Sequence, residues 1–508
     1  MFETILFPPG EALPGREQDP ECFRDLNLDQ IFAPILKKEE KYHIGPWFYT
    51  PLHSKNAVFY RQEILKDLEK PELRQAFEDF SAEIYGLGLY MEECRKYAES
   101  RDPWHDNDLN RGHILWFAER YCRAVEELLR QTDRCPPKSR GLTEFLQFLR
   151  DYAASPACQE MARKTRDLRQ RFSALRYCML IHNGTVRVKK YEGEADLSVR
   201  VEEMFQKFRQ GEVKEYRQKF PEEPHAAHVE AGVLSCLAKI YPEEFRDLRE
   251  FCEKFLDFMD PTIFRFSGEI RFYLSWLRRT GDLARCGLGL CYPTFPDNGH
   301  LEARSFYDLA LAGKIGSKIV VNDFSLDAPE RILVVTGPNQ GGKTTFARAL
   351  GQMHYLASLG LSVPGRHAEL CLPDQVLTHF ERQEDLYTLN GKLEDELERL
   401  RDLLTQAGKN SVIIINEIFA STTLKDAEQL GRHMMDRLAS LGAFCVVVTF
   451  LDELARHGKE TVSMMSLVRD GKRTFEVRRK PPDGLAYARQ AAERYGLTYE
   501  KLKGRIRP

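Results

Sequence analysis

The pattern of apolar and polar residues changes near residue 288 and divides the chain into two kinds of sequence. Before this point, apolar residues recur at helical spacing, as in the segment that begins at Ala57 and in the segment from His113 to Leu129. Beyond it, short continuous apolar runs alternate with helical patterns, which is typical of strands buried on both faces. These runs are Ile332 to Val335, Val412 to Ile415 and Phe444 to Val448.

The pattern therefore predicts a mostly α-helical domain at 56–287 and an α/β domain at 288–508. The junction is rich in glycine and proline, which suits a domain boundary. Residues 1–55 are also rich in these residues and predict an irregular N-terminal lead-in. Near 177–197, two β-prone runs flank Asn183-Gly184, a pair that fits a tight type I′ turn, so we expect an inserted β-hairpin there.

A glycine-rich loop, GPNQGGKT, follows the first of the apolar runs and precedes a helical pattern from Thr345 to Leu359. Glycines let consecutive backbone N–H groups turn towards phosphate oxygens, and a helix N-terminus adds partial positive charge. Lys343 would hold the outer phosphates and act in catalysis, and the Thr344 hydroxyl would ligate Mg²⁺. The predicted cofactors are therefore ATP and Mg²⁺. The loop residues expected to contact the nucleotide are Gly337, Pro338, Asn339, Gln340, Gly341, Gly342, Lys343, Thr344 and Thr345.

Hydrolysis of ATP also needs a second strand that carries groups for the metal and for the attacking water. The run Val412 to Ile415 ends at Asn416 and Glu417. Asn416 is neutral but can accept a hydrogen bond from a metal-bound water, and Glu417 is the predicted base and metal-side carboxylate. A plain polar strand end is the competing interpretation. The hydroxyls after it and Asp426 fit either helix capping or a role in the site.

The composition changes this picture little. Lys+Arg 74 against Asp+Glu 77 leaves a net charge of −3, so any contact with nucleic acid must use a local patch. Scattered cysteines without a C-x-x-C pair predict a cytoplasmic protein. The chain has no run of about 18 apolar residues, so we expect no membrane span. Cationic positions that could touch phosphate, or that simply form a solvated surface, are Arg163, Lys164, Arg166, Arg169, Arg171, Arg187, Lys189 and Lys190.

The segment TGPNQGGKTT, from Thr336 to Thr345, resembles the phosphate-binding loop of the MutS family of mismatch-repair ATPases. Asn322 corresponds to an asparagine on the adenine side of that family's site, and Ile319 stands where the family has an adenine-stacking aromatic residue. Asn416-Glu417-Ile418 is similar to the family's Asp-Glu-Ile. Further matches are Arg61 to Ile64, Glu396, Thr422, Asp426, Thr449, Glu453-Leu454 and the tail from Gly484 to Leu497.

The resemblance implies an ABC-type ATPase domain, long lever helices and a homodimer whose two ATP sites are shared between subunits. At three positions a polar group of the family is missing: Asn416 replaces its aspartate, Phe450 its switch histidine, and Gly391 the first residue of its trans-acting Ser-Thr-Phe motif. We therefore expect a slow ATPase. We also expect the family's mismatch-reading domain to be missing, because the stretch before the helical domain is short. Two functions stay open: a DNA clamp in mismatch repair or recombination, and an ATP-gated scaffold that binds protein or RNA.

Overall fold

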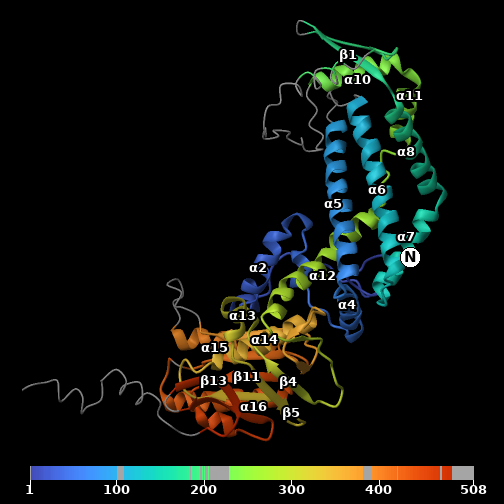
Figure 1. The fold of residues 1–508 in the computed structure, drawn as a ribbon. Helices are drawn as coiled ribbons and strands as arrows, with labels where there is room; N and C mark the ends of the chain where they lie inside the picture. The colour runs from blue at the N-terminus through green and yellow to red at the C-terminus, as the bar shows by residue number, and fades with distance from the viewer. Residues whose placement is uncertain are drawn as a thin grey trace, which may run out of the picture. The chain divides into compact units, whose positions relative to one another are not determined.

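The computed structural model describes residues 2–99, 108–182, 185–194, 197, 200, 204, 228–381, 391–419, 421–469 and 472–482. They form two compact units, of which one comprises residues 76–136 and 145–267 and the other 2–75, 137–144 and 268–508. Figure 1 shows the ribbon of each. These units differ from the predicted domains, because α5 (Pro71–Glu99), α7 (Arg140–Ala154) and α12 (Pro261–Arg285) each contribute residues to both. A helical pattern does not record where one packed unit ends and the next begins.

The second unit is built on a six-stranded sheet with the strand order β13-β12-β6-β11-β10-β9. Parallel pairing joins every neighbouring pair except β12 and β13, which form an antiparallel hairpin. The three predicted strands are therefore present and parallel. The strand bounds are β6 Ile332–Thr336, β9 Val376–Phe380, β10 Val412–Asn416, β11 Phe444–Val448, β12 Thr461–Arg469 and β13 Lys472–Arg479.

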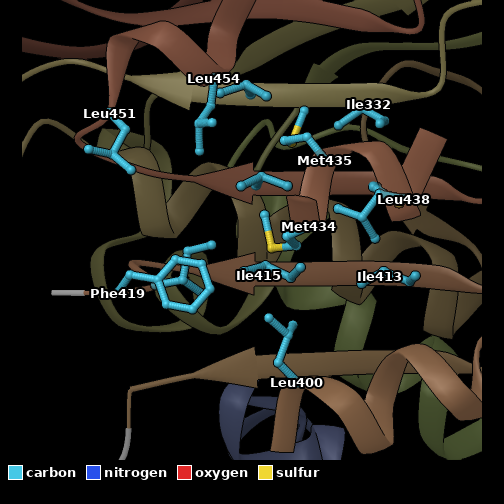
Figure 2. Close-up of a cluster of buried hydrophobic side chains, with 14 of the residues drawn as sticks. Ile332, Leu400, Ile413, Ile415, Phe419, Met434, Met435, Leu438, Leu451 and Leu454 are labelled. Carbon is cyan, nitrogen blue, oxygen red and sulfur yellow. The ribbon is translucent and has the colours of Figure 1, made fainter. Parts of the chain in front are cut away.

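Helices lie on both sides of this sheet (Figure 1), which explains why every residue of β6, β10 and β11 is buried. Figure 2 shows the cluster in which Ile332, Ile413 and Ile415 meet Leu400 and Met434. These last two residues belong to α15 (Lys392–Gln406) and α16 (Leu424–Leu441). On the other face lies α14 (Lys343–Ser358), and a Cβ at its Gly351 would lie 3.3 Å from the Ile414 side chain of β10 and 2.5 Å from the Leu26 side chain.

Shorter elements flank the main sheet in the same unit. A three-stranded antiparallel sheet has the order β5-β4-β8, and β3 pairs with β7. Asp308 caps the short helix α13 by accepting a hydrogen bond from the Leu311 N–H at 3.0 Å. The bounds are β3 Leu290–Cys291, β4 Leu301–Phe306, α13 Leu309–Ile315, η2 Gly316–Lys318, β5 Asn322–Leu326, β7 Val363–Pro364, β8 His367–Glu369 and η3 Asp452–Arg456.

The N-terminal segment, which the sequence predicts to be irregular, folds into short helices packed against α14. The ring of Phe23 meets Tyr355 edge-on with centroids 5.3 Å apart. The Gln352 amide donates to the Leu26 carbonyl at 2.8 Å, and the Tyr355 hydroxyl donates to a carbonyl of the same segment at 2.9 Å. The elements are α1 Cys22–Asp25, α2 Leu28–Lys38, η1 Glu40–Tyr42 and α3 Gly45–Tyr49, and α4 (Lys55–Leu68) follows where a helical pattern is predicted from Ala57. Tertiary contacts with α14 order a sequence whose local composition favours turns.

A buried arginine ties α4 to the end of α14. Arg61 is fully buried, and its guanidinium donates to the carbonyls of Leu6 at 2.9 Å and Leu359 at 3.0 Å. Burial lowers the pKa of Arg61 to about 10. The rings of Phe7 and Phe272 lie about its charge, with centroids 5.1 and 4.9 Å away. The helix that begins at the glycine-rich loop is thus fixed at its far end by hydrogen bonds to a charged side chain.

The first unit is mostly helical and carries the hairpin. Helix α6 packs against α8 and α11. Strands β1 and β2 pair antiparallel from Tyr177 opposite Lys190 to His182 opposite Thr185. The predicted turn at 183–184 lies outside the described residues. The bounds are α6 Asp108–Arg134, α8 Pro156–Ala174, β1 Tyr177–His182, β2 Thr185–Lys190, α10 His228–Ile240 and α11 Pro242–Lys254.

No helix in the described part of the chain combines the length and the apolar character needed to cross a membrane.

Candidate nucleotide site

The glycine-rich loop joins the central strand β6 to the first turn of α14, as the sequence predicts. Three of its residues have left-handed backbone: Gly337 at φ 115°, Gln340 at φ 58° and Gly342 at φ 96°. A Cβ at Gly337 would lie 3.0 Å from the Ser466 carbonyl oxygen, so the turn leaves no room for a larger residue. Glycine is needed here both for its φ and for this close approach. Asn339 and Gln340 are exposed, whereas Thr344 and Thr345 are half-buried.

Lys343 is the first residue of α14, and only 4% of its surface is exposed. Its ammonium donates to the carbonyls of Gly337 at 2.9 Å and Pro338 at 3.2 Å and to the Asn339 side chain at 3.3 Å. Burial lowers the pKa of Lys343, and the nearby charge of Glu417 opposes this shift. The lysine therefore places a positive charge inside the loop, near the acidic residue that follows β10.

The β12–β13 hairpin covers one side of the loop. The Ser466 hydroxyl donates to the Gly341 carbonyl at 2.6 Å, and the Arg473 guanidinium donates to the Gln340 side chain at 2.7 Å. A Cβ at Gly342 would approach the Phe475 carbonyl oxygen to 3.3 Å. The sequence pattern does not reveal that Ser466, Arg473 and Phe475 contact the loop. Ser466 and Gly341 are 125 residues apart, and no local pattern reports such a pairing.

The predicted acidic strand end reaches the same edge of the sheet as the loop. In register, Asn416 of β10 pairs with Val448 of β11, which pairs with Val335 of β6. All three strands are parallel, so their carboxyl ends meet at one edge. Glu417 is half-buried, and its N–H donates to the Val448 carbonyl at 2.9 Å. The structure thus brings Glu417 and Lys343 together.

Within the described part of the chain, two buried oxygens at this edge have no hydrogen-bond partner: Oδ1 of Asn416 and Oγ1 of Thr336, the last residue of β6. A buried polar atom without a partner costs about 1–3 kcal/mol. A hydrogen-bond donor at this edge, such as a metal-bound water, would offset this cost in free energy. The available ligands are the half-buried Thr344 hydroxyl, the Asn416 amide oxygen and the Glu417 carboxylate. This set fits Mg²⁺, which binds oxygen ligands and keeps several waters.

Asn322 lies at the start of β5 and is buried. Its Oδ1 accepts a hydrogen bond from the Val477 N–H at 2.7 Å and so joins β5 to β13. This contact uses the side-chain oxygen for the fold, and the expected role of Asn322 beside adenine stays a prediction. Ile319, at the position of the family's stacking aromatic residue, is buried as well.

Thr423, one of the hydroxyl residues after Glu417, caps α16. The Thr423 hydroxyl accepts a hydrogen bond from the Asp426 N–H at 3.3 Å and donates to the Asp426 carboxylate at 2.7 Å. The capping interpretation therefore holds for these two residues. Phe450 is 48% exposed just after β11, and the buried Thr449 hydroxyl accepts the Leu451 N–H at 3.0 Å.

The positions of the expected trans-acting motif lie at the start of α15. Gly391 is exposed and precedes the helix, Lys392 pairs with Glu381 at 2.6 Å, and Leu393 packs against the core cluster. Glu396 instead points inward and accepts a hydrogen bond from the Phe419 N–H at 2.8 Å. The predicted tail motif from Gly484 onward lies outside the described residues.

Several of the cationic positions in the first unit are paired with acids. Arg169 meets Glu119 at 2.8 Å, and Arg171 meets Asp247 at 2.7 Å. Lys189 forms an ion pair within the hairpin region. Paired cations offer less charge to phosphate than free ones. The interpretation as a solvated charged surface therefore gains support for these positions.

A buried strand, a glycine-rich loop with an enclosed lysine, and an acidic residue at the end of a second parallel strand together define a P-loop nucleotide-binding domain. Residues 333–497 match the family model of MutS domain V. Through this segment the chain is similar to the MutS family.

Two curated relatives illustrate the match. The chain is 31% identical over 221 residues to "Endonuclease MutS2" of Thermus thermophilus, which covers 42% of this chain and 29% of that protein. It is 32% identical over 162 residues to "DNA mismatch repair protein MutS" of an Exiguobacterium species, which covers 31% of this chain and 19% of that protein. The matched segments span less than a third of either relative.

Proposed function

We propose that this protein binds ATP with Mg²⁺ and hydrolyses it slowly, as a homodimer that acts on DNA in mismatch repair or recombination. The observation that carries the proposal is the placement of Glu417 beside the enclosed Lys343 at the carboxyl edge of the sheet. Free thiols among the described cysteines favour a reducing compartment such as the cytoplasm.

Each residue has a defined task in this proposal. Backbone N–H groups of the loop and the Lys343 ammonium bind the phosphates. Mg²⁺ would be held by the Thr344 hydroxyl, by Glu417 and, through a water, by Asn416. The bound metal would neutralise charge on the phosphates. Glu417 also orients the attacking water and accepts its proton.

The proposed slowness has a physical cause at three positions. Asn416 brings no negative charge to the metal, Phe450 offers no hydrogen bond to the γ-phosphate, and Gly391 brings no side chain to a partner's site. Stabilisation of transition-state charge supplies most of the catalysis in phosphoryl transfer. Loss of these polar groups therefore lowers the rate more than it lowers ATP binding.

A shared site makes turnover depend on protein concentration. We expect ATPase activity per subunit to rise with concentration and reach a plateau once the dimer is saturated, because dimerisation obeys mass action. Steady-state phosphate release, measured over a range of protein concentrations beside sedimentation of the same samples, checks this. The Glu417→Gln variant sets the background. Constant activity per subunit across the monomer–dimer transition would argue against shared sites.

The names of the two relatives favour DNA as the partner, whereas the paired cations of the first unit favour the scaffold alternative. A DNA clamp should bind duplexes with an affinity that falls linearly with salt on a double-logarithmic plot. Fluorescence anisotropy with matched, mismatched and junction-containing DNA measures both the affinity and its slope. Arg187→Ala, at an exposed hairpin position, should lower the slope by about one phosphate contact. ATP-dependent dimers that bind none of these DNAs would support the scaffold.

A further inference from the structure

The segment that follows the proposed catalytic carboxylate has an unusual backbone. Glu417 has φ 55° and Phe419 has φ 57°, both in the left-handed region that residues other than glycine rarely adopt. Such conformations persist only where surrounding contacts impose them. The side chains of Ile418 and Phe419 are buried in the core cluster shown in Figure 2. The direction of the Glu417 side chain therefore depends on what holds this segment from 417 to 419.

Two hydrogen bonds hold its backbone. At one end, the Glu417 N–H donates to the Val448 carbonyl of β11 at 2.9 Å. At the other, the Phe419 N–H donates to the Glu396 carboxylate of α15 at 2.8 Å. The first bond links the segment to a strand of the sheet. The second is made by a side chain that lies 23 residues away in the sequence.

The Glu396 carboxylate is itself fixed in place. Its side chain is only 11% exposed, and the same oxygen that receives the Phe419 N–H lies 3.8 Å from Nε2 of His379. His379 is buried on β9, in register with Ile415 of β10, one residue before Asn416. Burial alone would raise the pKa of Glu396, but the nearby His379 imidazole and the hydrogen bond from the Phe419 N–H outweigh it and lower that pKa. The carboxylate is thus kept ionised as an acceptor.

We propose that Glu396, oriented by His379, is a positioning residue that holds the strained 417–419 segment and thereby aims Glu417 at the phosphates. The Glu396 side chain ends at the backbone of Phe419, so it acts through Glu417. The inference rests on the proposed ATP hydrolysis for its kinetic consequence. Its structural consequence, restraint of the Phe419 N–H, stands apart from any activity.

Three variants separate the positioning role of Glu396 from the effect of its charge and from a general loss of stability. Glu396→Ala removes the acceptor, Glu396→Gln keeps an oxygen acceptor of the same length, and Glu398→Ala removes an exposed carboxylate from the same helix as a matched control. We expect Glu396→Ala to lower kcat for ATP about tenfold with KM changed by less than about threefold, because small displacements of a catalytic group are costly. Glu396→Gln and Glu398→Ala should remain close to wild type.

Amide hydrogen exchange supplies a readout that needs no turnover. Peptides containing residues 415–419 of the full-length protein should exchange faster in Glu396→Ala than in Glu396→Gln or Glu398→Ala. Unchanged exchange and kcat in Glu396→Ala would overturn the inference, and so would equal losses in Glu396→Ala and Glu396→Gln. If the wild type does not hydrolyse ATP, the proposed function fails, while the exchange comparison still decides the role of Glu396. If Glu396→Ala does not fold, Glu396→Asp, which shortens the acceptor by one methylene, takes its place.

Discussion

Replacement of Glu417 by glutamine is expected to leave ATP bound but almost uncleaved. Glutamine has the same length and keeps the backbone hydrogen bond to Val448, yet it cannot accept a proton from the attacking water. General-base catalysis contributes typically about 10²–10⁴-fold, so single-turnover cleavage should fall by that factor. Binding of a fluorescent ATP analogue should change little, because the loop and Lys343 are intact.

The matched control for this experiment is Glu428→Gln, which neutralises a half-buried carboxylate on α16. Its cleavage rate should equal that of the wild type. Equal single-turnover rates for wild type and Glu417→Gln would show that Glu417 is not catalytic. A loss of ATP binding in Glu417→Gln would instead place this carboxylate in the binding of the metal–nucleotide complex.

Replacement of Asn416 by aspartate is expected to tighten Mg²⁺ binding and to raise the rate of ATP cleavage. This is opposite to the effect on cleavage expected for Glu417→Gln. The Asn416 Oδ1 is buried and meets no donor among the described residues, so a carboxylate there would accept a charge-assisted hydrogen bond from a metal-bound water. Groups just outside the metal's own ligands typically change metal affinity or activity by about 10–100-fold. The Mg²⁺ concentration for half-maximal ATP cleavage should therefore fall by a factor of this order, and turnover should rise.

Stability gives an independent check of the same substitution. At a position that is 8% exposed, an unpaired carboxylate is costly, so Asn416→Asp should unfold at a lower temperature than wild type without Mg²⁺. Mg²⁺ with ATP should restore much of that difference. Asn410→Asp, an exposed position two residues before β10, controls for the added charge and should show neither effect. An unchanged Mg²⁺ dependence of Asn416→Asp would remove this residue from the metal site.

The proposals share one physical theme, which is that the site combines an intact phosphate cradle with a weakened catalytic edge. Gly337, Gly342 and Lys343 keep the backbone and the charge that phosphate binding needs. Asn416 and Phe450 remove charge and hydrogen bonding where hydrolysis needs them. Such a site favours a protein whose conformation follows nucleotide binding more closely than nucleotide cleavage.

Local chemistry was readable from the sequence by itself. Continuous apolar runs predicted the parallel strands β6, β10 and β11, because strands covered on both faces need apolar side chains at every position. The glycine pattern predicted the loop between β6 and α14, because its backbone requires left-handed conformations and close approach. Asn416 and Glu417 could be assigned to the same edge as that loop, since parallel strands end together.

The tertiary structure alone decided which distant residues complete the site. Ser466 reaches Gly341 across 125 residues, and Glu396 reaches the backbone after Glu417 from another helix. It also decided that the N-terminal segment packs on α14, against the expectation of an irregular lead-in. Hydrogen bonds and packing between segments far apart in the chain leave no periodic or local signal, because each partner is a common residue type whose role depends on its neighbours in space.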